Sequence, residues 1–315
     1  MSNYRIQLEY KRPEYEAVDS QKKIFFIFFT AVDEYVAWLE MHNRRPRTVQ
    51  SNRGCLISMS KRVLDTLGDC TFDQIGEQEI NDLLQSFEGL SEATKKVYLE
   101  TFGRLVAFET GINPVANARL MWNKIEPTHR IFISADDWPK IKASAQSTTD
   151  KLILGLGAYM GLRREEMIRI RLTDIMGNVL LIRGKGHGID GRVTAKEIPI
   201  PVLQYLNDYL ADRAKINPLH DQLLIRIDGK YPGKKMDGRS IRFACDMMGK
   251  RCGVYFTPHS LRRLYATTMY EATGYDIAQT KIATRHVSTD VLLNCYINVN
   301  PARQKEAVDR MLQII

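Results

Sequence analysis

The chain has 315 residues, which is enough for two domains that each bury a core. It carries 45 Lys plus Arg against 37 Asp plus Glu, and the formal net charge of +8 favours a polyanionic partner such as nucleic acid. The five cysteines are widely spaced and include no Cys-x-x-Cys pair, which argues against a disulfide framework or a zinc site.

The N-terminal residues 1–20 are interpreted as an extension, because they lack the apolar segment of a signal peptide. The apolar cluster at 24–29 is followed by Asp33 and Glu34, and is far shorter than the roughly twenty residues that a membrane span needs. We therefore expect a cytoplasmic protein without membrane association, and a nucleoid-associated one if the host is prokaryotic.

Helical periodicity dominates the first half of the chain. Residues 22–39 repeat apolar side chains at helical spacing, which predicts an amphipathic helix. Gly89 and Gly111 separate the further helical segments, which are 48–67, 77–87 and 91–110. We expect residues 21–112 to form a helical domain of about four helices.

A basic stretch lies at the start of the second of these helices. Such a stretch can contact a DNA backbone, and the alternative is a solvated helix face. The residues concerned are Arg44, Arg45, Arg47, Arg53, Lys61 and Arg62.

Periodicity is lost over residues 113–132, which we interpret as a linker, and a second domain is expected over 133–315. Its predicted elements are helices at 152–160 and 163–172, two short strands at 179–182 and 197–200 that form a hairpin, and mostly helices from 201 onward. The predicted fold is mainly α with a small β-hairpin or sheet: a helical N-terminal domain followed by an α+β domain.

One helix start in the second domain places two candidate phosphate-binding groups together. Thr257 is a suitable N-cap and Pro258 a suitable first residue, so His259 and Arg262 leave the same face near the positive end of the helix. For an isolated pair, the simpler interpretation is that His259 caps a helix and that Arg262 is a solvated surface arginine.

Further groups occur elsewhere in the second domain. Phosphodiester transfer needs guanidinium groups for the non-bridging oxygens, a nucleophile and a proton donor. The chain offers these as Arg163 after Gly161 and Leu162, Lys185 between two glycines in the hairpin, His286, and Tyr296.

This ordered set resembles the tyrosine recombinases, also called the phage integrase family. Gly-Leu-Arg at Arg163 with Glu166 three residues later, Gly-Lys-Gly at Lys185, and His-x-Leu-Arg from His259 to Arg262 match its motifs. His286 matches the family's late histidine and Tyr296 its nucleophile. The segment 91–114 is similar to its helical domain that clamps DNA, so that the resemblance covers most of the chain from about residue 22.

The chain departs from the family pattern at two places. Thr284-Arg285-His286 stands where Leu-Gly-His is usual, and the interval to Tyr296 is one residue longer than in many bacterial members. The hairpin tip is also long, which leaves Lys196 as the alternative to Lys185.

The resemblance implies a site-specific recombinase that cleaves and rejoins DNA through a 3'-phosphotyrosyl bond at Tyr296. Arg163 and Arg262 would hold the phosphate, Lys185 would protonate the leaving 5'-oxygen, His259 would accept the tyrosine proton, and His286 would support the phosphate. No cofactor or metal is expected. The implied partners are double-stranded DNA with short inverted core sites and other copies of the chain, in a tetramer on paired sites.

The two ends of the chain allow two further predictions, one about domain content and one about assembly. The short N-terminal extension favours an enzyme without a separate arm-binding domain. Pro301 follows a capping residue, Asn300, and an apolar stripe predicts a C-terminal helix over 301–315 that docks onto a neighbouring copy.

Two alternatives use the same fold. One is a type IB topoisomerase-like enzyme or hairpin telomere resolvase, which the DNA product would distinguish. The other is a catalytically inactive DNA-binding regulator, which would form no covalent adduct.

Overall fold

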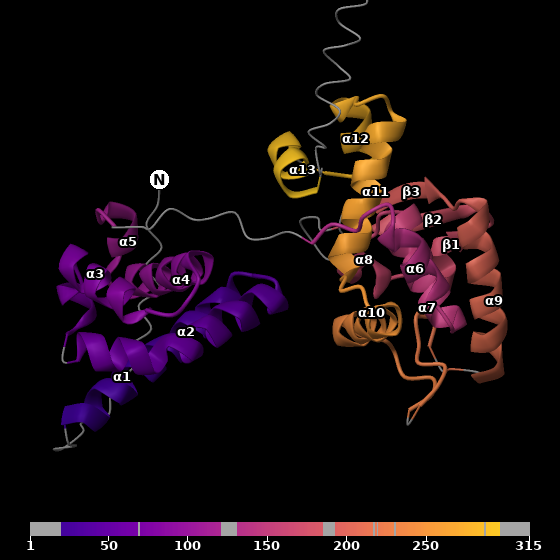
Figure 1. Cartoon of the computed structure of the whole chain (residues 1–315). Coiled ribbons are helices and arrows are strands. Elements are labelled where there is room, and N and C mark those ends of the chain that lie inside the picture. The colour runs from indigo at the N-terminus through magenta and orange to yellow at the C-terminus, as the bar shows by residue number, and fades with distance from the viewer. Residues whose placement is uncertain are drawn as a thin grey trace, which may run out of the picture. The chain divides into compact units, whose positions relative to one another are not determined.

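The computed structural model describes residues 20–68, 70–120, 131–184, 193–216, 218, 220–229, 231–286 and 288–296, and only the backbone of residues 20–26, 117 and 294–296. The chain divides into two compact units, Met1–Thr128 and His129–Ile315 (Figure 1). Residues 1–19 of the predicted extension, Lys185 and the predicted C-terminal helix 301–315 lie outside the described residues.

The first unit is helical, as its periodicity predicts. α2 packs against α1, α3 and α4, and its Leu56 and Met59 are completely buried. Ser91 caps α4 by accepting a hydrogen bond from the amide of Thr94, and Gly111 ends that helix with φ at 81°. The elements are α1 (Ser20–Met41), α2 (Pro46–Leu67), η1 (Phe72–Gln74), α3 (Glu77–Ser86), α4 (Glu92–Thr110) and α5 (Pro114–Asn117).

α5 occupies part of the segment 113–132 that the sequence predicts as a linker. Asn113 accepts hydrogen bonds from the amides of Val115 and Ala116, and Pro114 takes the first helical position. α5 packs against α3 and α4. Good capping thus forms a short helix where apolar periodicity is absent.

The second unit is mainly α with a small antiparallel sheet, so the predicted fold class is confirmed. Its elements are α6 (Asp137–Ala143), α7 (Thr148–Leu154), η2 (Gly155–Tyr159), α8 (Arg164–Met167), η3 (Leu172–Asp174), β1 (Ile175–Met176), β2 (Val179–Arg183), β3 (Val193–Glu197), α9 (Ile200–Ile216), α10 (Gly238–Cys252), α11 (Pro258–Ala272), α12 (Ile277–Thr284) and α13 (Thr289–Tyr296).

The sheet has the order β1-β2-β3, and Val179 pairs with Glu197 at one end of the β2–β3 ladder and Arg183 with Val193 at the other. The prediction of the second strand at 197–200 was wrong, because β3 ends where that range begins. Pro199 has no amide hydrogen to continue the ladder, and its carbonyl accepts from Val202 in the first turn of α9.

The predicted helix at 163–172 was also too long. α8 has a single turn, after which the chain pairs with a distant segment: Leu223 donates its amide to Ile170 at 2.8 Å, and Leu172 donates to Asp221 at 2.7 Å. These long-range backbone bonds replace the helical bonds that local periodicity predicts.

The helix that carries Arg262 lies close to η2, a π-helical segment, because two glycines leave room for it. A Cβ at Gly157 would lie 2.8 Å from Cβ of Leu261, and one at Gly161 would collide with the ring of Tyr265. Gly161 also has φ at 65°, which favours glycine. These contacts bring the start of α8 and its Arg163 up to α11.

Candidate functional site

Arg163 is the N-cap residue of α8 and is held by a carboxylate one turn later. Its amide donates to Oε2 of Glu166 at 2.9 Å, and its Nη1 donates to Oε1 at 2.9 Å. The Glu166 side chain is 4% exposed, whereas that of Arg163 is 32% exposed. The guanidinium therefore reaches from a buried anchor toward solvent.

Arg262 lies on α11 and is completely buried. Its Nη1 donates to the carbonyl of Gly161, and its Nη2 donates to the carbonyl of Thr284 at 2.6 Å. Nη1 lies 4.0 Å from Oε2 of Glu166. The arginine thus connects the turn before α8 with the end of α12, and it is oriented mainly by backbone carbonyls.

His286 lies two residues after the end of α12, behind the C-cap residue Arg285, and is 6% exposed. Its Nε2 lies 3.2 Å from Nη2 of Arg262, and its Nδ1 lies 2.7 Å from Oγ1 of Thr284. Burial, together with the charges of Arg262 and Arg163, lowers the pKa of His286 to about 3. The ring is therefore neutral near pH 7.

His259 occupies the first turn of α11, where Thr257 caps the helix and Pro258 takes the first position, as predicted. The residue is exposed. Partial burial of the ring and the nearby guanidinium groups of Arg263 and Arg262 lower the pKa of His259 to about 4. It is therefore also a neutral base near pH 7.

Of the two hairpin lysines, the structure describes Lys196. Its Nζ donates to the carbonyl of Met160 at 2.9 Å, to the hydroxyl of Tyr265 at 2.6 Å and to the carbonyl of Ala283 at 3.3 Å. Burial, with the charges of Arg285 and Arg262, lowers the pKa of Lys196 to about 7. Lys196 is thus engaged in joining β3 to η2, α11 and α12.

Tyr296 is the last residue of α13, and its side chain lies outside the described residues. α13 packs against α11 and α12 (Figure 1), with Leu292 buried against Ala266. The backbone of the candidate nucleophile thus belongs to a helix that lies beside the one carrying Arg262.

Two residues of this cluster were not among the sequence candidates for the site. In the sequence, Glu166 is only part of the motif that follows Arg163, although its spacing from Arg163 fits a capping pair. Arg285 is only a departure from the family pattern in the sequence. Its Nη2 forms an ion pair with Oε2 of Glu166 at 2.8 Å, and its side chain is 12% exposed.

Glu166 is the anion that organises the three arginines. Although burial favours its neutral form, the charge of Arg285, the amide of Arg163 and the remaining guanidinium groups lower the pKa of Glu166 below its ordinary value. One carboxylate is thus surrounded by three guanidinium cations. The excess of positive charge suits a phosphate group.

The candidate DNA-binding residues lie on or just before α2 in the first unit. Arg44, Arg45, Arg47, Arg53 and Lys61 are exposed. Arg53 forms an ion pair with Asp33 at 3.1 Å. Arg62 is half-buried and donates from Nε to the carbonyl of Ser86 at 3.1 Å, which gives it a packing contact within the unit.

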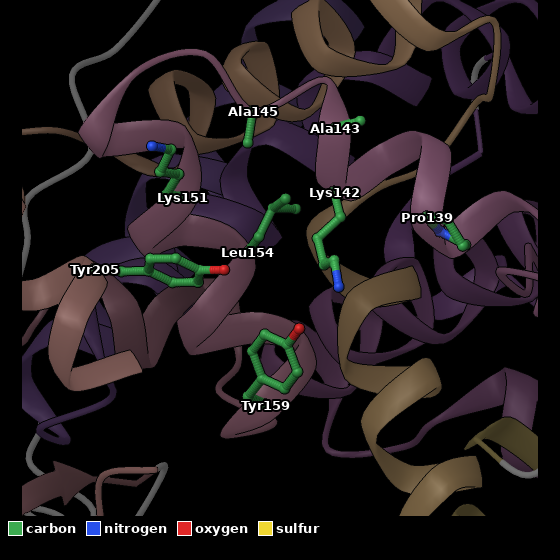
Figure 2. Close-up of a pocket in the computed structure, with 8 residues that line it drawn as sticks. All are labelled: Pro139, Lys142, Ala143, Ala145, Lys151, Leu154, Tyr159 and Tyr205. Atoms are coloured by element: carbon green, nitrogen blue, oxygen red, sulfur yellow. The ribbon is translucent and has the colours of Figure 1, made fainter. Parts of the chain in front are cut away.

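A separate pocket of about 270 Å³ lies at α6, α7 and α9. Figure 2 shows its lining, in which Lys142, Lys151, Tyr159 and Tyr205 accompany Leu154. The lining includes none of the candidate site residues. In the part of the chain that the structure describes, no three His, Cys, Asp or Glu residues group as metal ligands, and no helix is long and apolar enough to cross a bilayer.

Comparison with known proteins gives one family and several relatives. The model of the Phage integrase family matches residues 131–303. Transposase A from transposon Tn554 of Staphylococcus aureus is 28% identical over 172 residues, which cover 52% of this chain and 47% of the relative. The chain thus spans about half the length of this curated relative.

Solved structures share the fold. XerH site-specific recombinase bound to a palindromic difH substrate matches with a TM-score of 0.67 and 18% identity, over 94% of this chain and 90% of that chain. A lambda integrase tetramer bound to a Holliday junction matches with a TM-score of 0.65 and 17% identity, over 86% and 77%.

Proposed function

The chain belongs to the phage integrase family of tyrosine recombinases, and on this premise we propose that it is a site-specific recombinase that cleaves and rejoins DNA through a 3'-phosphotyrosyl intermediate. The observation that carries the proposal is the cluster around Glu166. Arg163, Arg262 and His286 come from different segments of the chain. Arg163 and Arg262 both form ion pairs with Glu166, and Arg262 is hydrogen-bonded to His286, so the three residues lie in one electropositive site.

In the proposed reaction, the hydroxyl of Tyr296 attacks the scissile phosphorus. A bond forms between the tyrosine oxygen and phosphorus, and the bond from phosphorus to the 5'-oxygen breaks. His259 accepts the phenolic proton, and its lowered pKa supports this because the ring is neutral beforehand. Lys185 donates a proton to the leaving 5'-oxygen.

The two family arginines stabilise the charge that develops on the non-bridging oxygens. Arg163 is partly exposed and anchored by Glu166, so its outer N–H groups can meet a phosphate. Arg262 is fixed by backbone carbonyls, and His286 accepts a hydrogen bond from it. His286 thus supports the phosphate by orienting Arg262.

The proposed partner is double-stranded DNA with short inverted core sites, bound by several copies of the chain as a tetramer on paired sites. The DNA-bound relatives support this, because one holds a palindromic substrate and another is a tetramer on a Holliday junction. Truncation after Asn300 tests the assembly: single-site binding should remain while cooperative binding to paired sites is lost. Unchanged cooperativity would contradict a docking role for 301–315.

A suicide substrate tests the chemistry. Sequencing the junctions around the gene supplies the target site, and a nicked duplex of that site traps the covalent adduct because the cleaved strand diffuses away. The wild type should form an SDS-resistant adduct and Tyr296→Phe should not. Tyr275→Phe is the matched control, since Tyr275 lies before His286 and should leave the adduct unchanged. A wild type that binds this site and forms no adduct would favour an inactive regulator.

The DNA product then distinguishes a recombinase from a topoisomerase-like enzyme and from a telomere resolvase. Two target sites should yield recombinant molecules. Relaxation of circles without site preference would indicate a topoisomerase-like activity, and sealed hairpin ends would indicate a telomere resolvase.

A further inference from the structure

Arg285 adopts a backbone conformation that residues with a Cβ rarely take. Its φ is 57° and its ψ is 42°, at the end of α12. The amide of His286 donates back to the carbonyl of Lys281 at 3.1 Å, which closes the helix and directs His286 toward Arg262. Glycine is the usual residue at such a left-handed helix end. Arginine therefore takes this conformation at an energetic cost.

The side chain of Arg285 supplies a contact that offsets this cost. Its Nη2 lies 2.8 Å from Oε2 of Glu166 and 3.5 Å from the carbonyl of Gly161. Glu166 is buried at 4% exposure, and the side chain of Arg285 is largely covered at 12% exposure. A buried ion pair of this geometry is strongly unfavourable to break, because it would leave a charge without compensation.

The ion pair affects how Glu166 shares its two oxygens. Oε1 accepts from the guanidinium of Arg163, while Oε2 accepts from the amide of Arg163 and from Arg285. Arg262 lies 4.0 Å from the same Oε2, beyond hydrogen-bonding distance. Arg285 thus occupies the position on the carboxylate that Arg262 would otherwise fill.

We propose that Arg285 is a positioning residue of the phosphate site, which engages Glu166 and so holds Arg262 at its present distance of 4.0 Å from that carboxylate, in the orientation that the backbone carbonyls give it. This inference rests on the proposed function for its catalytic consequence. Without Arg285, Glu166 attracts Arg262 into a close ion pair, and an arginine needed for the phosphate is withdrawn. Arg285 need not touch the substrate.

The inference predicts that a second substitution compensates the first. Arg285→Gly removes the guanidinium and relieves the backbone, and should slow single-turnover cleavage by about 100-fold, as a misplacement of about 1 Å can do. Glu166→Gln removes the charge that captures Arg262. The double variant should therefore cleave faster than the product of the two single losses, and Arg285→Lys should retain most of the rate.

Comparison of Arg285→Ala with Arg285→Gly separates the effect of losing the guanidinium charge from the effect of the left-handed backbone conformation. It loses the same guanidinium as Arg285→Gly but keeps a Cβ in the left-handed region. The two variants should cleave equally slowly, while Arg285→Gly unfolds at the higher temperature. DNA affinity should change much less than the cleavage rate in both, because the scissile phosphate is one of many backbone contacts.

A binding measurement separates this inference from the proposed function. Inorganic phosphate should raise the Tm of the wild type, because a ligand of the native state stabilises it. The increase should be smaller in Arg285→Gly and restored in Arg285→Gly with Glu166→Gln, with chloride at equal ionic strength as the control. This readout holds even if the wild type forms no covalent adduct.

Two results would overturn the inference. One is a phosphate-dependent Tm shift that is the same in Arg285→Gly as in the wild type. The other is a double variant in which cleavage losses simply multiply, since this would mean that Arg285 does not act through Glu166. If Arg285→Gly is poorly folded, Arg285→Ala makes the same comparison, with Arg285→Lys as the variant that keeps the charge.

Discussion

Nη2 of Arg262 donates a hydrogen bond to Nε2 of His286 at 3.2 Å, and this contact fixes the protonation state of the histidine. Thr284 donates its hydroxyl hydrogen to the carbonyl of Thr280, so its Oγ1 accepts from Nδ1 of His286. The ring therefore carries its proton on Nδ1 and presents a lone pair to Arg262. A second proton would lie against a buried guanidinium.

This arrangement predicts a loss of stability in acid. Unfolded histidine has a pKa of about 6.5, whereas burial and nearby guanidinium charges lower the pKa of His286 to about 3 and that of His259 to about 4. Below about pH 6.5 the unfolded state binds more protons than the folded state, so the free energy of unfolding should fall as the pH falls toward 4.

His286→Asn should make that pH dependence shallower. Urea unfolding between pH 7 and pH 4 measures the slope, and His42→Asn serves as a control in the first unit. An unchanged slope in His286→Asn would mean that His286 is not held neutral in the folded protein.

Gly161 and Gly177 form a second, matched comparison. Their φ values are 65° and 63°, so alanine is strained at both. A Cβ at Gly177 meets nothing within 4 Å, whereas one at Gly161 collides with Tyr265. We expect Gly177→Ala to destabilise by about 1 kcal/mol, and Gly161→Ala by about 3 kcal/mol because overpacking adds to the strain.

The two glycine variants should also differ in cleavage. Gly161→Ala moves the carbonyl that accepts from Arg262 and should reduce cleavage even where the protein is folded, while Gly177→Ala should not. Urea unfolding and the adduct assay measure both effects. Equal destabilisation by the two substitutions would contradict the close packing of α11 on η2.

Much of the local structure could be predicted because local chemistry decides it. Thr257 and Pro258 begin α11 as expected, since the cap satisfies amides within the same turn. The ordered set of Arg163, Lys185, His259, Arg262, His286 and Tyr296, with the motifs around them, was specific enough to recognise the family. These signals depend on residues that are close in sequence or on a motif pattern.

The remainder depends on contacts between distant segments. α8 ends early because residues near Ile170 pair with residues near Leu223. The ion pair of Arg285 with Glu166 joins residues on α8 and after α12, and no spacing rule relates them. The contacts of Lys196 with Met160 and Ala283 likewise appear only when the fold brings them together.

Lys196 and Lys185 should respond differently to a change of leaving group. A 5'-phosphorothiolate bond releases a thiolate, which needs less protonation than an alkoxide because thiols are more acidic. If Lys185 is the general acid, as proposed, the substrate should therefore restore cleavage to Lys185→Ala. It should not restore Lys196→Met, because that substitution removes three structural hydrogen bonds. Restoration of Lys196→Met alone would assign the acid to Lys196.

Lys196 should also make the free energy of unfolding depend on pH above about pH 7. Unfolded lysine holds its proton to a pKa of about 10.4, whereas burial and the charges of Arg285 and Arg262 lower the folded pKa to about 7. Between these values the unfolded state binds more protons, so this group makes stability rise with pH from about 7 to 10. Urea unfolding over that range should show a shallower rise in Lys196→Met.

The exposed arginines before α2 should contribute to DNA affinity through contacts with the phosphate backbone. Each phosphate contact contributes about 0.9 to the slope of log affinity against log salt. Arg44→Ala and Arg45→Ala should each reduce the slope by about that amount, because both side chains are exposed. Arg62→Ala is the matched control: its guanidinium donates to the Ser86 carbonyl, so its loss should lower the Tm and leave the slope unchanged. Fluorescence anisotropy between 50 and 200 mM salt measures the slopes. If the wild type and all three variants gave equal slopes, these arginines would belong to a solvated helix face and would not contact DNA.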